Sequence, residues 1–532
     1  MTGPATTPAT AAQAKLFTHH RLFPADASFN LTALYRVTGR PDARRLQAAL
    51  DRVARGIRAL NTVFESRDGV VCAVYREPDE DRDSLVPLTV LPGDAEEFLA
   101  RDLAERSDEP IPPGERQYDF RVYQDDEAVY VTVVFSHLVN DGYSYYNFVA
   151  ELERVYTDPQ AQLSPSTKDD PAALVRPSAP GADTLEFFRT RLTGLTTLGD
   201  DRLQGRRDAT GALRGEERSH ELDAALSERI RVRARELGCT PFAFFLAAYL
   251  ITYARVSGGR RLVTGIPLAN RRGLRQRQAF GYFVNTLPLA VDLTAHPTFE
   301  DLCRSVQSAS VGMLRHQGFD LGAHTRQVSP GLTGNLLTCD NTFTYYKEAL
   351  RLRLPECTVT PVPLARRLVK YPLSMNVEEC GATFLLNVEC SDEQWHTDPT
   401  AVMCHVLSLV AQDPQRRIED IPALSPQAER RLFALVNPDS GGAQKEVPSS
   451  LTAWFERTAR EHPLRVAVRD GEEELTYAEL AERADRVAAR IAATAAGPHV
   501  GIAMRRGADL IAVILGTLKA GKAYVPLDPH SP

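Results

Sequence analysis

One short segment, SHLVNDG at residues 136–142, combines a histidine, an aspartate and a glycine that together could do chemistry. The imidazole of His137 can take up or release a proton near neutral pH without a large shift of its pKa. Asp141 follows four residues later, and a carboxylate that folding buries needs a cation or hydrogen-bond donors beside it. Gly142 carries no side chain, so a ligand can come close to the backbone there. The pattern indicates a candidate acid–base site at His137.

The same residues also have a structural interpretation, in which an Asp-Gly turn and an internally hydrogen-bonded histidine explain them without catalysis. The surrounding sequence places the segment between two predicted elements. Residues 128–135, AVYVTVVF, are rich in β-branched and aromatic residues and predict a strand. Residues 145–156 have the apolar spacing of a helix. His137 is therefore expected on a loop that leads from a strand into a helix.

The rest of the chain alternates between the two kinds of element. Residues 42–60 form an amphipathic helical pattern, and the apolar run 242–254 predicts a buried helix that is too short to span a bilayer. We expect further strands at 31–38, 261–268, 282–293, 341–347 and 373–390, and further helices at 185–192 and 299–317. This alternation predicts an α/β or mixed α+β fold.

Composition excludes several classes of protein. The 532 residues carry 62 basic and 69 acidic side chains, for a net charge of −7, so nothing points to nucleic acid or an anionic membrane surface. The N-terminal residues lack the apolar core of a signal peptide. Eight cysteines form no CxxC pair, which predicts neither a metal site nor a disulfide framework. We expect reduced thiols, no bound cofactor and a cytoplasmic location.

Several motifs in the chain resemble those of one family. SHLVNDG resembles the HHxxxDG signature of the chloramphenicol acetyltransferase-like superfamily, which includes the condensation domains of non-ribosomal peptide synthetases. AAQAKLF at 11–17, ALNTVF at 59–64 and FGYFVNTLPL at 280–289 resemble further condensation-domain motifs and occur in the same order, with FVNTL the most specific. RHQGF at 315–319 matches a further motif in part.

The resemblance assigns roles to the residues of the signature. His137 aligns with the second histidine, which is the mechanistic one in this family. Ser136 stands at the first, supporting position, where a hydroxyl can hold the loop by hydrogen bonding. A YxDFAVW-type segment expected before residues 185–192 is missing, which leaves the subtype of the domain open.

An arginine of the family lies fourteen residues before the asparagine of its FVNT motif. Arg271 has this spacing from Asn285, although Asn270 replaces the glycine that precedes the arginine in the family. The resemblance therefore implies an ion pair between Asp141 and Arg271 that holds the loop and moves no protons. The alternative is a solvated arginine, because other arginines follow closely.

The fold that the resemblance implies is a V-shaped pseudo-dimer of two acetyltransferase-like lobes, at residues 12–175 and 176–425, with a central tunnel. His137 would lie at the midpoint of the tunnel, with Gly142 and Asn285 along it. A donor acyl or peptidyl thioester and an acceptor aminoacyl thioester would enter from opposite sides on the phosphopantetheine arms of carrier proteins. We expect the donor carrier protein to act in trans, the acceptor carrier to lie downstream, and the chain to be a monomer.

A second unit follows a polar linker at 426–450. Within residues 451–532, LTYAEL at 475–480 and LKAGKAYVPLDPHSP at 518–532 resemble the first two core motifs of adenylation domains. The ATP-binding and catalytic motifs of that family would lie beyond residue 532, so we expect a truncated adenylation domain without amino-acid activation.

Two other functions stay open at this point. One is a CoA-dependent acyltransferase of the same superfamily, although such an enzyme is not expected to end in an adenylation start. The other is a non-catalytic, condensation-like platform that docks a tailoring enzyme, an idea that Ser136 keeps open.

Overall fold

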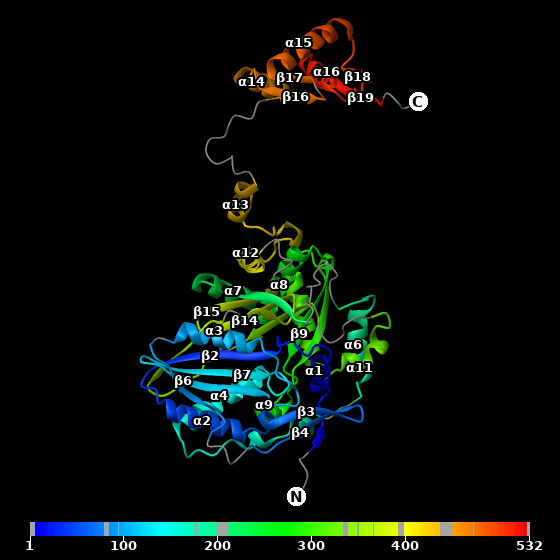
Figure 1. Ribbon diagram of the computed structural model, residues 1–532. Helices are drawn as coiled ribbons and strands as arrows, with labels where there is room; N and C mark the ends of the chain where they lie inside the picture. The colour runs from blue at the N-terminus through cyan, green and yellow to red at the C-terminus, as the bar shows by residue number, and fades with distance from the viewer. Residues whose placement is uncertain are drawn as a thin grey trace. The chain divides into compact units, whose positions relative to one another are not determined.

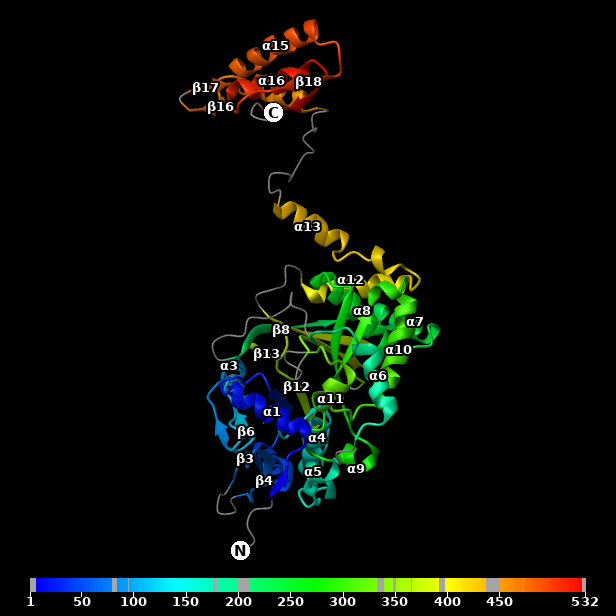
Figure 2. The same ribbon diagram turned by 90° about the vertical axis from the view of Figure 1, so that its right-hand side faces the viewer.

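The computed structural model describes residues 6–78, 84–93, 95–175, 179–198, 211–332, 339–347, 351–364, 366–391, 398–436, 450–471 and 473–528. The chain divides into two compact units, Met1–Gln427 and Ala428–Pro532. Figure 1 and Figure 2 show the elements of each unit. The first unit contains the histidine loop and two large β-sheets.

The first large sheet positions the histidine loop. Its strand order is β12-β2-β7-β6-β5, and its strands are β2 (Asn30–Gly39), β5 (Leu88–Val90), β6 (Tyr118–Gln124), β7 (Val129–Ser136) and β12 (Cys357–Pro361). Its faces are covered by α2 (Ala43–Gly56), α3 (Glu96–Ser107) and α4 (Gly142–Thr157) (Figure 1). Val131 packs in the core with α2 and α4, whereas Tyr130 packs with α3. Because both faces of β7 are buried, its sequence is apolar without alternation.

The second large sheet has the order β10-β9-β11-β14-β15-β8-β13. Its strands are β8 (Leu213–Glu221), β9 (Arg261–Leu268), β10 (Asn285–Asp292), β11 (Asn341–Tyr346), β13 (Leu368–Val369), β14 (Leu373–Cys380) and β15 (Thr383–Ser391). One face is covered by α7 (Ala224–Glu236), α8 (Pro241–Ser257), α10 (Phe299–Arg315) and α12 (Pro399–Gln412). On β15, Leu386 and Val388 enter this core, so Asn387 and Glu389 point to the opposite face.

Strand β12 lies at the edge of the first large sheet. It lies late in the chain, yet it pairs antiparallel with β2, from Cys357 opposite Gly39 to Pro361 opposite Tyr35. A segment numbered within the predicted second lobe therefore completes the first sheet. The lobe boundary at 175/176 stays a prediction.

Smaller elements complete the first unit. A three-stranded sheet consists of β1 (Thr6–Pro8), β3 (Thr62–Arg67) and β4 (Val70–Tyr75). The remaining helices are α1 (Ala11–Leu22), η1 (Arg58–Asn61), η2 (Pro165–Lys168), α5 (Pro171–Leu174), α6 (Ala182–Leu192), α9 (Gly273–Gln278), η3 (Leu293–Ala295), α11 (Leu321–Val328), η4 (Ile418–Asp420) and α13 (Pro426–Val436), the last of which crosses the boundary between the units. Within the described ranges no single helix is long and apolar enough to cross a membrane, although α7 and α8, which meet at 106°, pass that test as a pair.

The second unit is built from α14 (Leu451–Glu461), β16 (Val466–Asp470), β17 (Glu473–Thr476), α15 (Tyr477–Thr494), β18 (His499–Ile502), α16 (Ala508–Lys519) and β19 (Ala523–Pro526). Helices α15 and α16 share a small apolar core that includes Leu480, Ala484 and Leu515. Strands β16 and β17 form an antiparallel pair. Strands β18 and β19 pair in parallel.

Most elements predicted from the sequence are present. The strands expected at 31–38, 261–268 and 341–347 are β2, β9 and β11, and the buried helix at 242–254 lies within α8. Strand β8 was not predicted. Seven of its nine residues are exposed, and its charged sequence lacks the alternation of apolar and polar residues that indicates a strand. The predicted linker at 426–450 begins with α13, and residues 437–449 lie outside the described residues.

Candidate active site

The SHLVNDG segment is a short loop that hydrogen bonds from its backbone N–H groups hold in place. Ser136 ends β7, and its N–H donates to the carbonyl of Gln117 at 2.9 Å. The N–H of His137 donates to the carbonyl of Phe29, which precedes β2, at 3.1 Å. The hydroxyl of Ser136 accepts the N–H of Leu138 at 3.3 Å. A serine at this position therefore does support the loop by a hydrogen bond.

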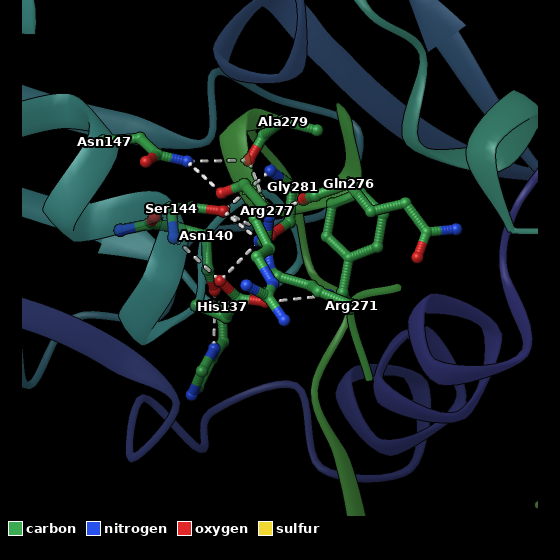
Figure 3. Close-up of polar contacts among 11 residues, drawn as sticks. His137, Asn140, Ser144, Asn147, Arg271, Gln276, Arg277, Ala279 and Gly281 are labelled. Atoms are coloured by element: carbon green, nitrogen blue, oxygen red, sulfur yellow. Dashed lines mark hydrogen bonds and ion pairs between the residues drawn. The ribbon is translucent and has the colours of Figure 1, made fainter. Parts of the chain in front are cut away.

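The tautomer of His137 follows from its contact with Asn140. Nδ1 lies 2.7 Å from the carbonyl oxygen of Asn140. A carbonyl can only accept, so Nδ1 carries the proton and Nε2 presents a lone pair. Figure 3 shows the ring reaching away from the contacts around Arg271, with Nδ1 toward Asn140. His137 is thus oriented to accept a proton or a hydrogen bond at Nε2.

The surroundings of His137 keep its ring neutral. Burial, the Lys370 ammonium and His20 lower the pKa of His137 to about 3, although the hydrogen bond to the Asn140 carbonyl acts in the opposite direction. The ring is half-buried, with the centroid of Tyr282 at 5.0 Å and that of Phe29 at 6.3 Å. At neutral pH the imidazole is therefore uncharged, so its lone pair is available but weakly basic.

Asp141 is enclosed by donors. Its Oδ1 accepts the N–H of Ser144 at 2.9 Å and Nη2 of Arg271 at 2.7 Å, and its Oδ2 accepts the N–H of Phe283 at 2.9 Å. The first of these bonds caps α4, which begins directly after the loop. The side chains of Asp141 and Arg271 are 2% and 0% exposed, so the ion pair is fully buried.

Arg271 is used entirely for structure. Its Nη1 donates to the carbonyls of Gln276 and Ala279 at 2.6 and 2.7 Å (Figure 3). Its guanidinium carbon lies 4.1 Å from the ring centroid of Phe283. Burial lowers the pKa of Arg271, and the charge of Asp141 acts against that shift. The ion pair implied by the resemblance is therefore formed, and the alternative of a solvated arginine does not apply.

The conformation of Asn270 explains the family's glycine before Arg271. Asn270 has φ of 51°, in the left-handed region that glycine adopts freely and asparagine tolerates better than most residues. The departure from the family pattern therefore keeps the backbone conformation that directs Arg271 inward.

Ser144 and Asn147 on α4 were missed in the sequence, and both clamp the segment that follows Arg271. The Ser144 hydroxyl donates to the Gly281 carbonyl at 2.7 Å and accepts the Gly281 N–H at 2.9 Å. The Asn147 amide donates to the carbonyls of Arg277 and Ala279 (Figure 3). Gly281 has φ of 140°, and a Cβ there would lie 2.5 Å from Pro171, so only glycine fits.

Asn285 and Gly142, which were predicted to lie along the tunnel, make structural contacts. Both amide hydrogens of Asn285 are taken by the carbonyls of Gln317 and Phe319, at 2.8 Å each. Asn285 therefore fixes the RHQGF segment to the start of β10. A Cβ on Gly142 would meet Tyr346 at 3.7 Å, an ordinary contact.

Several titratable groups lie on or beside the second sheet, and one of them, Lys370, acts on His137 through space. Burial is the main cause of each pKa shift in this group. It lowers the pKa of Lys370 to about 8 and raises the pKa of Glu217 to about 7. It also raises the pKa values of Tyr346 and Tyr371. Glu217 is exposed, whereas Lys370, Tyr346 and Tyr371 are half-buried. Across the described ranges, no group of three or more His, Cys, Asp or Glu side chains is placed to hold a metal ion.

Comparison with known proteins identifies the family. Residues 5–433 match the model of the Condensation domain, and residues 455–532 match that of the AMP-binding enzyme. The chain therefore belongs to the condensation-domain family and continues into the beginning of an adenylation domain. The fold is shared with solved condensation domains, as the following similarities indicate.

Among curated relatives, tyrocidine synthase 3 of Brevibacillus parabrevis is 26% identical over 99% of this chain, which covers 8% of that protein. Malpinin synthetase of Mortierella alpina is 30% identical over 76% of this chain, which covers 5% of that protein. Among solved structures, holo-AB3403, a four-domain nonribosomal peptide synthetase bound to AMP and glycine, has a TM-score of 0.72 at 18% identity, over 99% of this chain and 42% of its own. The first condensation domain of the CDA synthetase has a TM-score of 0.64 at 19% identity, over 79% of this chain and 99% of its own.

Proposed function

We propose that the first unit forms an amide bond between a donor acyl or peptidyl thioester and the amine of an acceptor aminoacyl thioester. Amide formation between carrier-bound substrates is the general role of the family to which the chain belongs. The observation that carries the proposal for this chain is the orientation of His137, whose Nδ1 donates to the Asn140 carbonyl so that Nε2 presents a lone pair.

The chemistry requires two proton movements. The neutral amine attacks the thioester carbonyl, and its nitrogen becomes positively charged and more acidic than the free amine. Nε2 of His137 can accept this proton, and the low pKa of the ring favours its prompt release to the leaving thiolate. The carbon–sulfur bond breaks, the thiolate receives a proton, and an amide and a free thiol result. Holding both thioesters end to end lowers the entropic barrier further.

The remaining parts of the proposal concern the surroundings of the enzyme. Both substrates would be carried on phosphopantetheine arms, with the donor carrier protein acting in trans, and the unit itself would hold no cofactor. The tunnel that admits the arms would run past His137 between the two lobes, with Gly142 on its wall. We also propose a monomer in the cytoplasm, which rests on composition rather than on a contact.

The two alternative functions differ in their substrates. A CoA-dependent acyltransferase would accept a free acyl-CoA donor, and the match of residues 455–532 to an AMP-binding enzyme argues against this reading. A docking platform would bind carrier proteins without turnover. The intact support of the histidine loop by Ser136 and Asp141 favours catalysis over a platform.

The test incubates the protein with a donor and an acceptor carrier protein, both loaded, and follows their intact masses. The wild type is expected to transfer the donor acyl group to the acceptor amine. His137→Ala is expected to lower the rate by about 10²–10⁴ if the ring acts as a base, and by less if it only orients the amine. His220→Ala, an exposed histidine on β8, is the matched control and should keep the wild-type rate. Equal product from wild type and His137→Ala would remove His137 from the mechanism.

A further inference from the structure

Lys370 lies beside the candidate active site, where its ammonium faces the ring of Phe29. It follows β13 directly, and its Nζ is 6.0 Å from the ring centroid of Phe29. The carbonyl of Phe29 accepts the N–H of His137, which brings the lysine into the surroundings of the imidazole. Among the residues that the structure describes, no hydrogen bond and no ion pair within 4.0 Å engages the ammonium.

The charges that face Lys370 come from several elements. Glu389 on β15 and Glu217 on β8 lie directly opposite each other in the sheet register. These two carboxylates, Asp26 and Arg366 all act on Lys370 through space, and His137 is the fifth group within range. The carboxylates offset part of the positive charge but do not bind it.

An unpaired ammonium that is largely removed from water is costly, and most such lysines in proteins are paired. Burial lowers the pKa of Lys370 to about 8, which still leaves the side chain mostly charged at neutral pH. The same charge lowers the pKa of His137. A cation beside a base serves a reaction in which a proton leaves one atom while negative charge develops on a neighbouring atom.

We propose that Lys370 stabilises the negative charge that develops on the thioester carbonyl oxygen when the acceptor amine attacks beside His137. This inference rests on the proposed function. As the nitrogen–carbon bond forms, the carbonyl electron pair moves onto oxygen, next to the ammonium. The pair returns when the carbon–sulfur bond breaks. His137 takes the proton from nitrogen and passes it to the thiolate, and Lys370 keeps its own protons throughout.

The test compares Lys370→Met with Lys370→Arg in the assay with two loaded carrier proteins. We expect Lys370→Met to lower kcat by about 10²–10³ and to leave KM for the carrier proteins within about threefold. Lys370→Arg keeps the cation and is expected to retain a rate within about tenfold of the wild type. Lys168→Met, which removes an exposed lysine of η2, is the control and should change neither constant.

The pH dependence separates this role from a structural one. Because the cation is the active form, its benefit should fade as pH rises through about 8. The ratio of the wild-type rate to that of Lys370→Met should therefore fall between pH 7 and 9.5. A constant ratio, or a rate for Lys370→Met within about threefold of the wild type, would overturn the inference while amide formation by the wild type stands. If Lys370→Met does not fold, the rate of Lys370→Arg and the pH profile of the wild-type rate still test the inference. Absence of any amide product from the wild type would overturn both proposals.

Discussion

Replacing Asp141 by asparagine should destabilise the first unit strongly, because this isosteric change places a donor against a buried donor and removes the counter-charge of Arg271. The carboxylate accepts the Ser144 N–H and the Arg271 guanidinium at Oδ1 and the Phe283 N–H at Oδ2. An asparagine oxygen can satisfy the first two, but its NH₂ group then faces the Phe283 N–H, donor against donor. Arg271, whose side chain is 0% exposed, also loses its counter-charge. Breaking a buried ion pair from one side typically costs about 3–5 kcal/mol.

Urea denaturation, monitored by far-UV circular dichroism, measures this loss of stability. With an m-value of about 3 kcal/mol per M, the unfolding midpoint of the first unit should fall by about 1–2 M. Arg271→Met should cost a similar amount, and the double variant should cost less than the sum of the two, with a coupling of about 2 kcal/mol.

A matched control lies a few residues away on the same segment. Arg275 pairs with Asp169 at 2.6 Å, but the Arg275 side chain is 74% exposed. Arg275→Gln should therefore cost less than about 1 kcal/mol. A loss below about 1 kcal/mol for Asp141→Asn, or strictly additive effects of the two buried changes, would refute the idea that this ion pair fastens the histidine loop.

Two further changes test other parts of the site. Ser136→Ala removes the acceptor of the Leu138 N–H and should cost about 1 kcal/mol in urea denaturation while kcat stays within tenfold of the wild type; an unchanged midpoint would contradict the supporting role of the hydroxyl. Glu217→Gln tests a pH dependence. Burial and Glu389 raise the pKa of Glu217 from 4.5 to about 7, so its ionisation opposes folding, and this cost grows from about pH 4.5 and is complete above about pH 7. The variant should melt higher than the wild type at pH 8 and equally at pH 4.5, and the same difference at both pH values would show that the charge of Glu217 is not the cause.

The local pattern of the sequence was sufficient for many elements of the fold. The apolar run at 242–254 predicted a buried helix, and all of its residues except the half-buried Phe242 are buried in α8. Strand β8 could not be predicted, because its charged sequence has no strand pattern and the strand is held by pairing with β15 and β13. Strand β12 could be assigned to the first sheet only by the pairing with β2, which joins residues some 320 positions apart in the chain.

The candidate site divides in the same way. The order and spacing of the motifs were enough to single out His137, Asp141 and Arg271, because the number of residues between the histidine loop and its arginine can be counted in the sequence. Lys370 and Ser144 carry no such signal. Their importance depends on which side chains folding brings beside them, and nothing in the segments around them records that.

The sequence by itself determined the family, the histidine and the arginine that pairs with Asp141, since those depend on residue type and spacing. Only the tertiary structure decided that Nδ1 holds the proton, that Asn285 fixes a backbone turn and that the Lys370 ammonium acts on the imidazole through space. The physical reason is that tautomer, hydrogen-bond occupancy and pKa are set by groups in contact through space, and these groups come from segments that are far apart in the chain.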